Sequence, residues 1–158
     1  MGYTSRFLTL TKGTGVINRI FHGYGKFEGE MDGRKNGALI SMANGKAVAF
    51  AIFNLQARGE MFVTHNDPVY EGMIVGLAPK PGDMIINVMK GKQLTNMRTQ
   101  GTDENVVLTP VRQMSIAEQL SMLNTDEALE ITPKSLRLRK AILNPNERKK
   151  NEKSGTPL

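Results

Sequence analysis

The chain has 158 residues and a formal net charge of +6, and it contains no cysteine and no tryptophan. This length allows one domain, or one domain and a smaller segment. The lack of cysteine excludes a disulfide framework and a thiolate metal site. The sequence has no apolar run of about 18 residues that could cross a bilayer. Composition therefore predicts a cytoplasmic protein that does not enter a membrane.

The positive charge is concentrated at the C-terminal end. Residues 1–133 carry thirteen Lys/Arg and thirteen Asp/Glu, whereas residues 134–158 carry eight cations and two acids, Glu147 and Glu152. A second, local excess lies between residues 80 and 102, which hold four cations and only Asp83. Such patches steer a polyanion to particular faces of a protein, although a basic tail alone also serves solubility.

The first predicted elements are a helix and a strand. Residues 2–13 (GYTSRFLTLTKG) favour a short helix that ends at Gly13, because glycine adopts the left-handed C-terminal conformation. Residues 16–24 (VINRIFHGY) are rich in β-branched and aromatic residues, which favour a strand. We expect residues 1–26 to form a separate segment, residues 27–143 the main domain, and residues 144–158 a basic helix and tail.

The main domain is predicted to begin with a hairpin. Two apolar runs, GALISMA and KAVAFAIF, are joined by Asn44-Gly45. Asn and Gly tolerate the positive φ that both central residues of a type I′ turn require. Residues 54–59 (NLQARG) then predict one helical turn closed by Gly59.

The later elements are mostly short strands. MFV, GMIVGLA, MIINVMK and NVVLTP read as strands separated by turn-forming residues. Ser115 and Glu118 have the spacing of a capping box, which opens an acidic helix to about Leu123. ALEIT and SLRLRK predict two more strands, and Asn144 with Pro145 predicts the start of a final helix. The expected fold is α+β and β-rich, with roughly eight short, mainly antiparallel strands and two or three short helices.

Residues 91–104 (GKQLTNMRTQGTDE) form the most informative segment. They contain only two large apolar residues, which is too few for a strand or an amphipathic helix. A long polar segment between two predicted strands is usually functional or disordered. Its cations and short hydrogen-bonding side chains suit phosphate and sugar oxygens.

Several sequence segments, occurring in the same order along the chain, resemble those of a known family. GRKNGALIS, GKAVAFAIFNLQARGEMFV, VYEGMIVG, GKQLTNMR, GTDE and EITPKSLRLRK resemble the C-terminal region of the BipA/TypA translational GTPases. Residues 5–24 look like the second helix and last strand of the ferredoxin-like domain V of elongation factor G. No GxxxxGK[ST] phosphate loop is present. The resemblance implies a C-terminal fragment that is not an enzyme and has no cofactor, with GTP and Mg²⁺ bound by a G domain absent from this chain.

The resemblance also implies a function. BipA/TypA proteins are ribosome-associated GTPases linked to stress responses and large-subunit assembly, and their C-terminal region contacts the tRNA-binding face. The expected partners are the large ribosomal subunit, rRNA and the acceptor end of tRNA, bound by a monomer. A basic surface would contact phosphates, sugars and base edges; the candidate residues are Lys90, Lys92, Thr95, Asn96, Arg98, Thr102, Arg137, Arg139 and Lys140.

The strand pattern of SLRLRK, independently of the family resemblance, makes its two arginines candidate phosphate contacts. Side chains alternate along a strand, so Leu136 and Leu138 point to one face while Arg137 and Arg139 point to the other. Two guanidiniums about 7 Å apart suit successive phosphates, given a rise of roughly 3.3 Å per residue. The alternative is a solvated outer face that balances the acidic helix.

Two other classes of function are alternatives to RNA binding: a protein-interaction module and a small enzyme. The polar segment and the basic tail could instead bind an acidic ribosomal protein or the protein's own G domain. A small independent enzyme is disfavoured because no nucleophile, base and orienting group occur together. His22 and His65 are 43 residues apart and lack a further ligand at a metal-like spacing, so a zinc site is not expected.

Overall fold

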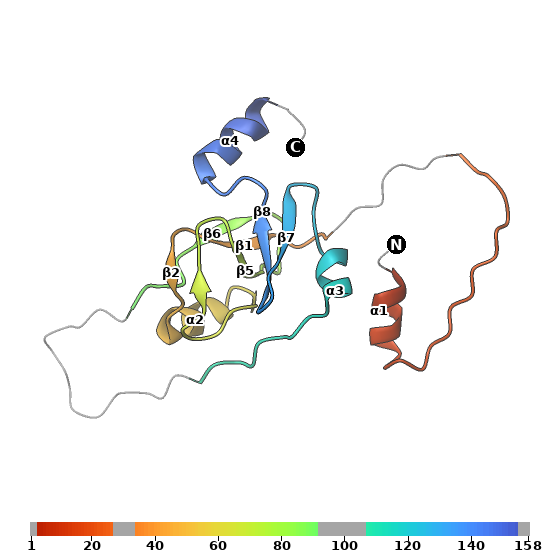
Figure 1. Ribbon diagram of the computed structural model, residues 1–158, viewed down its shortest axis with the longest axis horizontal. Coiled ribbons are helices and arrows are strands. Elements are labelled where there is room, and N and C mark those ends of the chain that lie inside the picture. Colours follow the sequence, from red (N-terminus) through yellow and green to blue (C-terminus); the bar gives the residue numbers. More distant parts are fainter. Residues whose placement is uncertain (1–2, 27–33, 92–106, 155–158) are drawn as a thin grey trace, which may run out of the picture.

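A four-stranded sheet lies at the centre of the domain (Figure 1). The computed structural model describes residues 3–26, 34–91 and 107–154. The strand order is β3-β5-β1-β6, with β1 (Ala38–Ser41) between β5 (Ile74–Leu77) and β6 (Met84–Ile86). β3 (Glu60–Met61) pairs with the other edge of β5. β1 runs antiparallel to β5 and parallel to β6, so the sheet is mixed.

The two faces of this sheet are covered by different elements. Leu39 and Val75 contribute to a larger core that also contains Ile52 and Leu55 of helix α2 (Ala49–Gln56). Ile40 and Ile74 lie on the opposite face, because neighbouring strand residues alternate, and pack with Leu138 in a second core. The sheet therefore separates α2 from the C-terminal hairpin.

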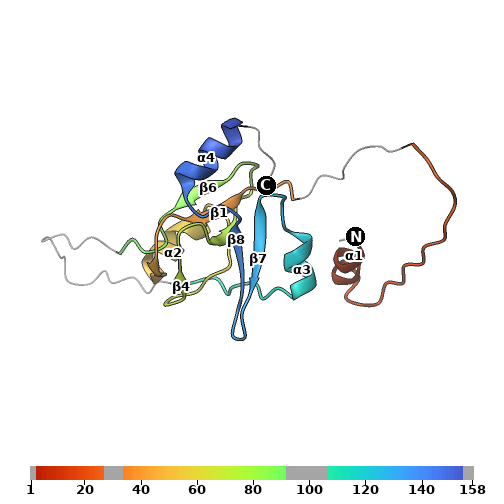
Figure 2. The same ribbon diagram turned by 45° about the horizontal axis from the view of Figure 1, so that its top comes forward.

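The C-terminal hairpin is formed by β7 (Glu127–Ile131) and β8 (Leu136–Lys140), which pair antiparallel in full register. Figure 2 shows this hairpin extending past the sheet, with helix α3 (Ile116–Ser121) beside β7. A backbone hydrogen bond from Lys140 N to Gly72 O, 2.9 Å long, ties β8 to the segment that leads into β5. Strands β7 and β8 and helix α3 carry several of the charged residues of the candidate site.

Three predicted helices are confirmed by their termini. Helix α1 (Tyr3–Leu10) is followed by Gly13 at φ +81°, the left-handed conformation expected there. Ser115 accepts from the Glu118 N–H at 3.3 Å at the start of α3. Asn144 Oδ1 accepts from the N–H of Asn146 and Glu147 ahead of helix α4 (Pro145–Ser154). Local sequence signals were sufficient for these helix ends.

The predicted Asn-Gly hairpin is wrong. Neither Asn44 nor Gly45 has positive φ. β1 pairs inside the central sheet, whereas β2 (Gly45–Lys46) pairs with β4 (Pro68–Val69). Most of the second apolar run is helix α2 rather than a strand. A continuous apolar run does not distinguish a strand from a buried helix by periodicity, and its alanines favour the helix.

Two more predicted strands are absent from the described residues. Residues 14–26 contain no strand, and Val16, Ile20, Phe21 and Tyr24 among them are exposed, with Tyr24 fully so. The predicted strand of residues 105–110 has no counterpart from Val107 onward, and its first two residues lie outside the described ranges. Among the described residues, neither segment lies beside another strand that could pair with its backbone. The presence of a pairing partner determines whether a strand forms more than β-propensity does.

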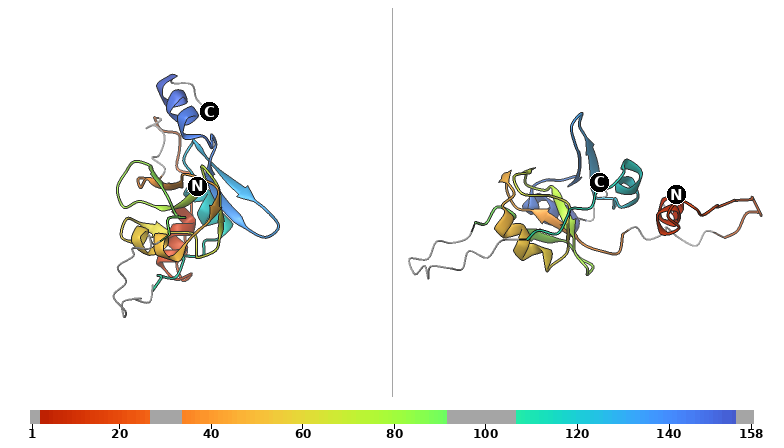
Figure 3. Two further views of the ribbon diagram at one scale, coloured as in Figure 1. Left: turned by 90° about the vertical axis from the view of Figure 1, so that its left-hand side faces the viewer. Right: turned by 90° about the horizontal axis from the view of Figure 1, so that it is seen from below.

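Within the described ranges, no helix is both long enough and apolar enough to cross a membrane. In the right-hand view of Figure 3, α1 lies beyond α3, away from the central sheet. The division into residues 1–26, 27–143 and 144–158 stays a prediction.

Candidate nucleic-acid interface

The polar segment of residues 91–104 falls mostly outside the part of the chain that the structure describes. Lys90 and Gly91 are described and exposed, directly after the short turn that follows β6. Of the predicted site residues, five are outside the described ranges: Lys92, Thr95, Asn96, Arg98 and Thr102. Their roles stay predictions.

The outer face of β8 carries Arg137 and Arg139, as the alternation predicts. Arg137 lies opposite Glu130 of β7 in the register, and its Nη1 is 3.5 Å from Glu130 Oε1. Both side chains are about one-third exposed, at 28% and 31%. A pair this exposed contributes little to stability, so Arg137 can exchange Glu130 for another anion at low cost.

Tyr70 holds the other oxygen of Glu130. Its hydroxyl donates to Glu130 Oε2 at 2.5 Å. Burial, followed by this hydrogen bond and the charge of Glu130, raises the pKa of Tyr70 to about 12. The hydroxyl therefore stays protonated at physiological pH and keeps Glu130 in place beside Arg137.

Arg139 is held by the backbone rather than by an acid. Its Nη1 donates to the carbonyl oxygens of Lys140 at 3.2 Å and Ala141 at 3.4 Å. Within the described residues it makes no ion pair. The guanidinium is thus oriented while its charge is left uncompensated, which suits a contact to phosphate.

Lys140 does not belong to this surface, which corrects the prediction. Its side chain is only 2% exposed, and Nζ lies 2.5 Å from Asp83, 2.6 Å from Asp126 and 3.1 Å from Glu127. Position 140 has the same parity as Leu136 and Leu138, so the alternation already placed it on the inner face. Its place directly after Arg137 and Arg139 in the sequence does not put it on their face.

Lys140, Asp83, Asp126 and Glu127 form a buried ion cluster that shifts the pKa values of Lys140 and Asp83. Burial alone would lower the pKa of Lys140, but the hydrogen bonds to Asp126 and Asp83 and the charge of Glu127 raise it overall. Burial likewise opposes ionisation of Asp83, yet the Ala38 N–H and Lys140 hold the pKa of Asp83 below its usual value. Lys140 and Asp83 are therefore both charged at neutral pH.

Arg34 completes this cluster, and no pattern in the sequence indicates its role. Its guanidinium bonds both oxygens of Glu127, at 2.8 and 3.2 Å, and both side chains are nearly fully buried. Residues 34 and 127 are far apart in sequence, so no local pattern could pair them. The cluster joins four segments of the domain and is structural.

Helix α4 provides further exposed cations. None of its residues is buried. Arg148 donates to the carbonyl oxygens of Ile142 and Leu143 at 2.9 and 2.5 Å, which ties the helix to the end of β8. Lys149, Lys150 and Lys153 are exposed.

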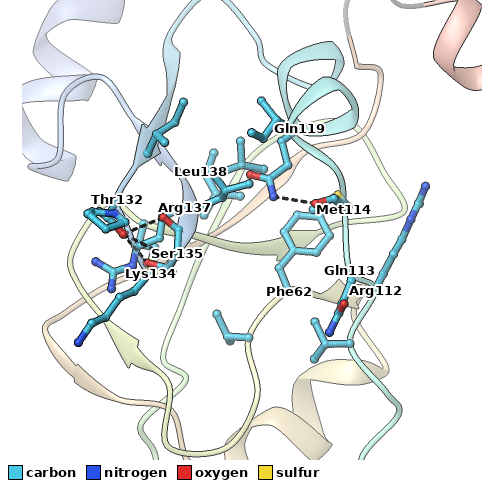
Figure 4. Close-up of a pocket in the computed structure, with 18 residues that line it drawn as sticks. Phe62, Arg112, Gln113, Met114, Gln119, Thr132, Lys134, Ser135, Arg137 and Leu138 are labelled. Atoms are coloured by element: carbon cyan, nitrogen blue, oxygen red, sulfur yellow. Dashed lines mark hydrogen bonds between the residues drawn. The ribbon is translucent and has the colours of Figure 1, made fainter.

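A cavity of about 690 Å³ lies between α3, the β7–β8 hairpin and residues 111–114 (Figure 4). Apolar side chains such as Phe62 and Leu138 line it, and Arg112, Lys134 and Arg137 are also among its lining residues. Arg112 is paired with Glu118 of α3. The sequence did not indicate this cavity, because its walls come from four separate segments.

Comparisons with known proteins agree with one another. The family model described as the TypA/BipA C-terminal domain matches residues 36–145. The chain is 47% identical, over 100% of its length, to the large ribosomal subunit assembly factor BipA of Buchnera aphidicola subsp. Schizaphis graminum. It is 46% identical, over 95% of its length, to the proteins of the same name from Salmonella typhimurium and Escherichia coli K12.

The chain spans 25% to 26% of the length of these relatives. The matched region contains the central sheet, α2, α3 and the hairpin, and with them all the residues of the cavity and all those of the ion cluster except Arg34. On the extent of both matches, the chain belongs to the TypA/BipA family and carries its C-terminal domain.

Proposed function

We propose that this domain binds RNA of the large ribosomal subunit and thereby anchors a ribosome assembly factor. The observation that carries the proposal is the 46–47% identity, over nearly the whole chain, to proteins named large ribosomal subunit assembly factor. The partly exposed arginines of β8 and the exposed lysines of α4 support it, because phosphate contacts dominate protein affinity for RNA.

The polar segment of residues 91–104 is proposed as the main contact. Lys90 begins it in an exposed position after β6. Lys92 and Arg98 would bind backbone phosphates of rRNA or of the tRNA acceptor end, and Thr95, Asn96 and Thr102 would bond sugars or base edges. Arg137 and Arg139 would add phosphate contacts from the hairpin.

The remaining expectations concern the whole protein. We expect the chain to act as a monomer in the cytoplasm without catalysis of its own. GTP hydrolysis with Mg²⁺, and any role in translation regulation or stress, would belong to a protein that also has a G domain.

The test is binding to isolated large subunits across a salt series. Five phosphate contacts, from Lys90, Lys92, Arg98, Arg137 and Arg139, should give a slope of log affinity against log salt of about −3 to −5, at roughly −0.7 to −0.9 per contact. Binding with a slope near zero would refute the RNA contacts and favour the alternative, a module that binds a ribosomal protein or the G domain.

A further inference from the structure

Gln119 of α3 has a buried polar atom without a partner. Its side chain is only 8% exposed and lines the cavity between α3 and the hairpin. The amide nitrogen donates to Met114 O at 3.4 Å, whereas Oε1 has no hydrogen-bond partner. Buried polar atoms are almost always paired, and an orphan acceptor is costly. The orphan oxygen therefore indicates a donor that comes from outside the described structure.

We infer that this cavity binds an unstacked RNA base whose amino group donates to Gln119 Oε1. The inference rests on the proposed function and adds a specific site to it. The cavity volume of about 690 Å³ lies within the range of small-molecule sites. Eleven of its 18 lining residues are apolar and suit the faces of a flat heterocycle, whose polar edge would point to Gln119 Oε1.

The walls of the cavity also fit a base. Phe62 is an aromatic side chain on which a base can stack, as in single-stranded RNA recognition. Figure 4 shows Phe62 beside Met114 and below Gln119. Ile116 and Ile131, also lining residues, are 48% and 64% exposed, so an occupant would cover apolar surface that now faces water.

The charges at the cavity suit the phosphates that flank a base. Figure 4 shows Arg112 on one side, and Lys134 and Arg137 on the other. Arg112 and Arg137 have partly exposed acidic partners, Glu118 and Glu130. Lys134, at the hairpin turn, is exposed and makes no ion pair within the described residues. It is the most available phosphate contact.

A peptide fits this cavity less well. Each peptide N–H brings a carbonyl that needs a donor of its own. The hydroxyls of Thr132 and Ser135 bond to each other across the turn, and Thr132 Oγ1 also bonds to Ser135 O. The Gln119 amide is engaged with Met114 O. The remaining donors are mainly the charged side chains of Arg112, Lys134 and Arg137, which suit phosphates better than peptide carbonyls.

The base preference follows from the same acceptor. Adenine and cytosine each present an exocyclic amino group on one edge. Uracil has no amino group, and its one ring N–H is flanked by two carbonyl oxygens. These two acceptors would face the acceptor Gln119 Oε1 and apolar side chains, without a donor. We therefore expect hexa-adenylate and hexacytidylate to bind about two- to tenfold more tightly than hexauridylate, the change expected for one net hydrogen bond.

The experiment uses the chain labelled with ¹³C at the methionine methyl groups. Met73 and Met114 line the cavity, whereas Met42 and Met84 are exposed elsewhere. Hexa-adenylate should shift the Met73 and Met114 signals at concentrations that leave Met42 and Met84 unchanged. Shifts confined to Met42 and Met84, or shifts at the cavity with an acidic phenylalanine-containing peptide but not with RNA, would overturn the inference.

Gln119→Met tests the acceptor, and Gln56→Met is its matched control. Gln56 of α2 lies on the other side of the sheet and donates to Thr109 O at 3.5 Å. Gln119→Met should abolish the base preference, weaken hexa-adenylate binding about two- to tenfold, and leave the melting temperature unchanged or higher. The control should bind as the parent does. Unchanged base preference in Gln119→Met would overturn the inference.

Two further measurements separate this inference from the proposed function. Lys134→Gln changes an exposed side chain and should reduce the salt slope of hexa-adenylate binding by about 0.7 to 1; an unchanged slope would count against the site. Binding of the parent chain to large subunits is measured in parallel. If the chain binds subunits but the cavity methyls do not respond to RNA, only the base pocket fails, whereas loss of subunit binding refutes the proposed function itself.

Discussion

Both faces of strand β8 carry basic side chains, but the lysine of the inner face is buried in ion pairs, whereas the arginines of the outer face are partly exposed and accessible to a ligand. On the inner face, the Lys140 ammonium is 2% exposed and contacts three carboxylates. On the outer face, Arg139 is bound only by backbone carbonyls among the described residues, and Arg137 shares a partly exposed acid with Tyr70. A basic residue next to other basic residues in the sequence is therefore not evidence of a binding surface. Its burial and its partners decide its role.

The largest effect is expected from Lys140→Met. Removing the ammonium leaves Asp83, Asp126 and Glu127 without it, and only Glu127 keeps a strong partner in Arg34. Breaking a buried ion pair from one side costs about 3–5 kcal/mol, and we expect about 3 because Asp83 and Asp126 are partly exposed to water. Urea unfolding measures the loss. Arg137→Met, the control on the outer face, should change stability by at most about 1 kcal/mol.

The next effect concerns the polar segment. Replacing Lys92 and Arg98 by Ala should weaken binding to large subunits well over tenfold, because a hydrogen bond to a charged group contributes on the order of 1.5–3 kcal/mol. The melting temperature should barely change, as for surface substitutions of about 0.5 kcal/mol or less. Co-sedimentation and thermal melts measure both. Early melting with normal binding would show that the segment packs on the domain instead.

A pair of glycine variants tests the framework that supports both faces. A Cβ at Gly59 would lie 2.0 Å from Leu77 O, which is fixed backbone of the central sheet. A Cβ at Gly45 would meet only Met89 Sδ, the end of a flexible side chain. We expect Gly59→Ala to destabilise the domain by about 1–3 kcal/mol through overpacking. Gly45→Ala should cost clearly less in the same urea titration; equal losses would contradict this packing.

The pH dependence of stability reports on the buried cluster. The raised pKa of Lys140 contributes stability that is complete below its ordinary value of 10.5 and is lost as pH rises through the folded-state pKa. The lowered pKa of Asp83 contributes stability that is complete above its ordinary value of 3.8 and is lost as pH falls through the folded-state pKa. Melting temperature should thus decline at both extremes. In Lys140→Met the alkaline decline should be reduced, and an unchanged alkaline decline would assign it to other groups.

The smallest effect on stability is expected from truncation after Leu143. Helix α4 has no buried residue, so its loss should change the free energy of unfolding by about 0.5 kcal/mol or less. Affinity for RNA should fall, because the truncation removes Arg148, Lys149, Lys150 and Lys153. A large loss of stability would instead mean that the hydrogen bonds from Arg148 to Ile142 and Leu143 hold the hairpin in place.

Elements with strong local signals were predictable from the sequence. The left-handed Gly13, the Ser115 cap and the Asn144-Pro145 helix start depend on contacts within a few residues. The β7–β8 hairpin also follows from its own alternation, since its strands are close in sequence and pair with each other. The family resemblance lies in longer words of the sequence and was confirmed by the comparisons.

Tertiary structure decided what depends on distant partners. The apolar run after Gly45 became helix α2 because it covers one face of the central sheet, and β1 paired with β5 and β6 rather than with its neighbour in sequence. The burial of Lys140 needed Asp83 and Arg34, which lie far from it in the chain. The sequence determined the family, the helix ends and the positions of the charges, while packing decided which charges are buried, because only the folded chain brings separate segments within hydrogen-bonding distance.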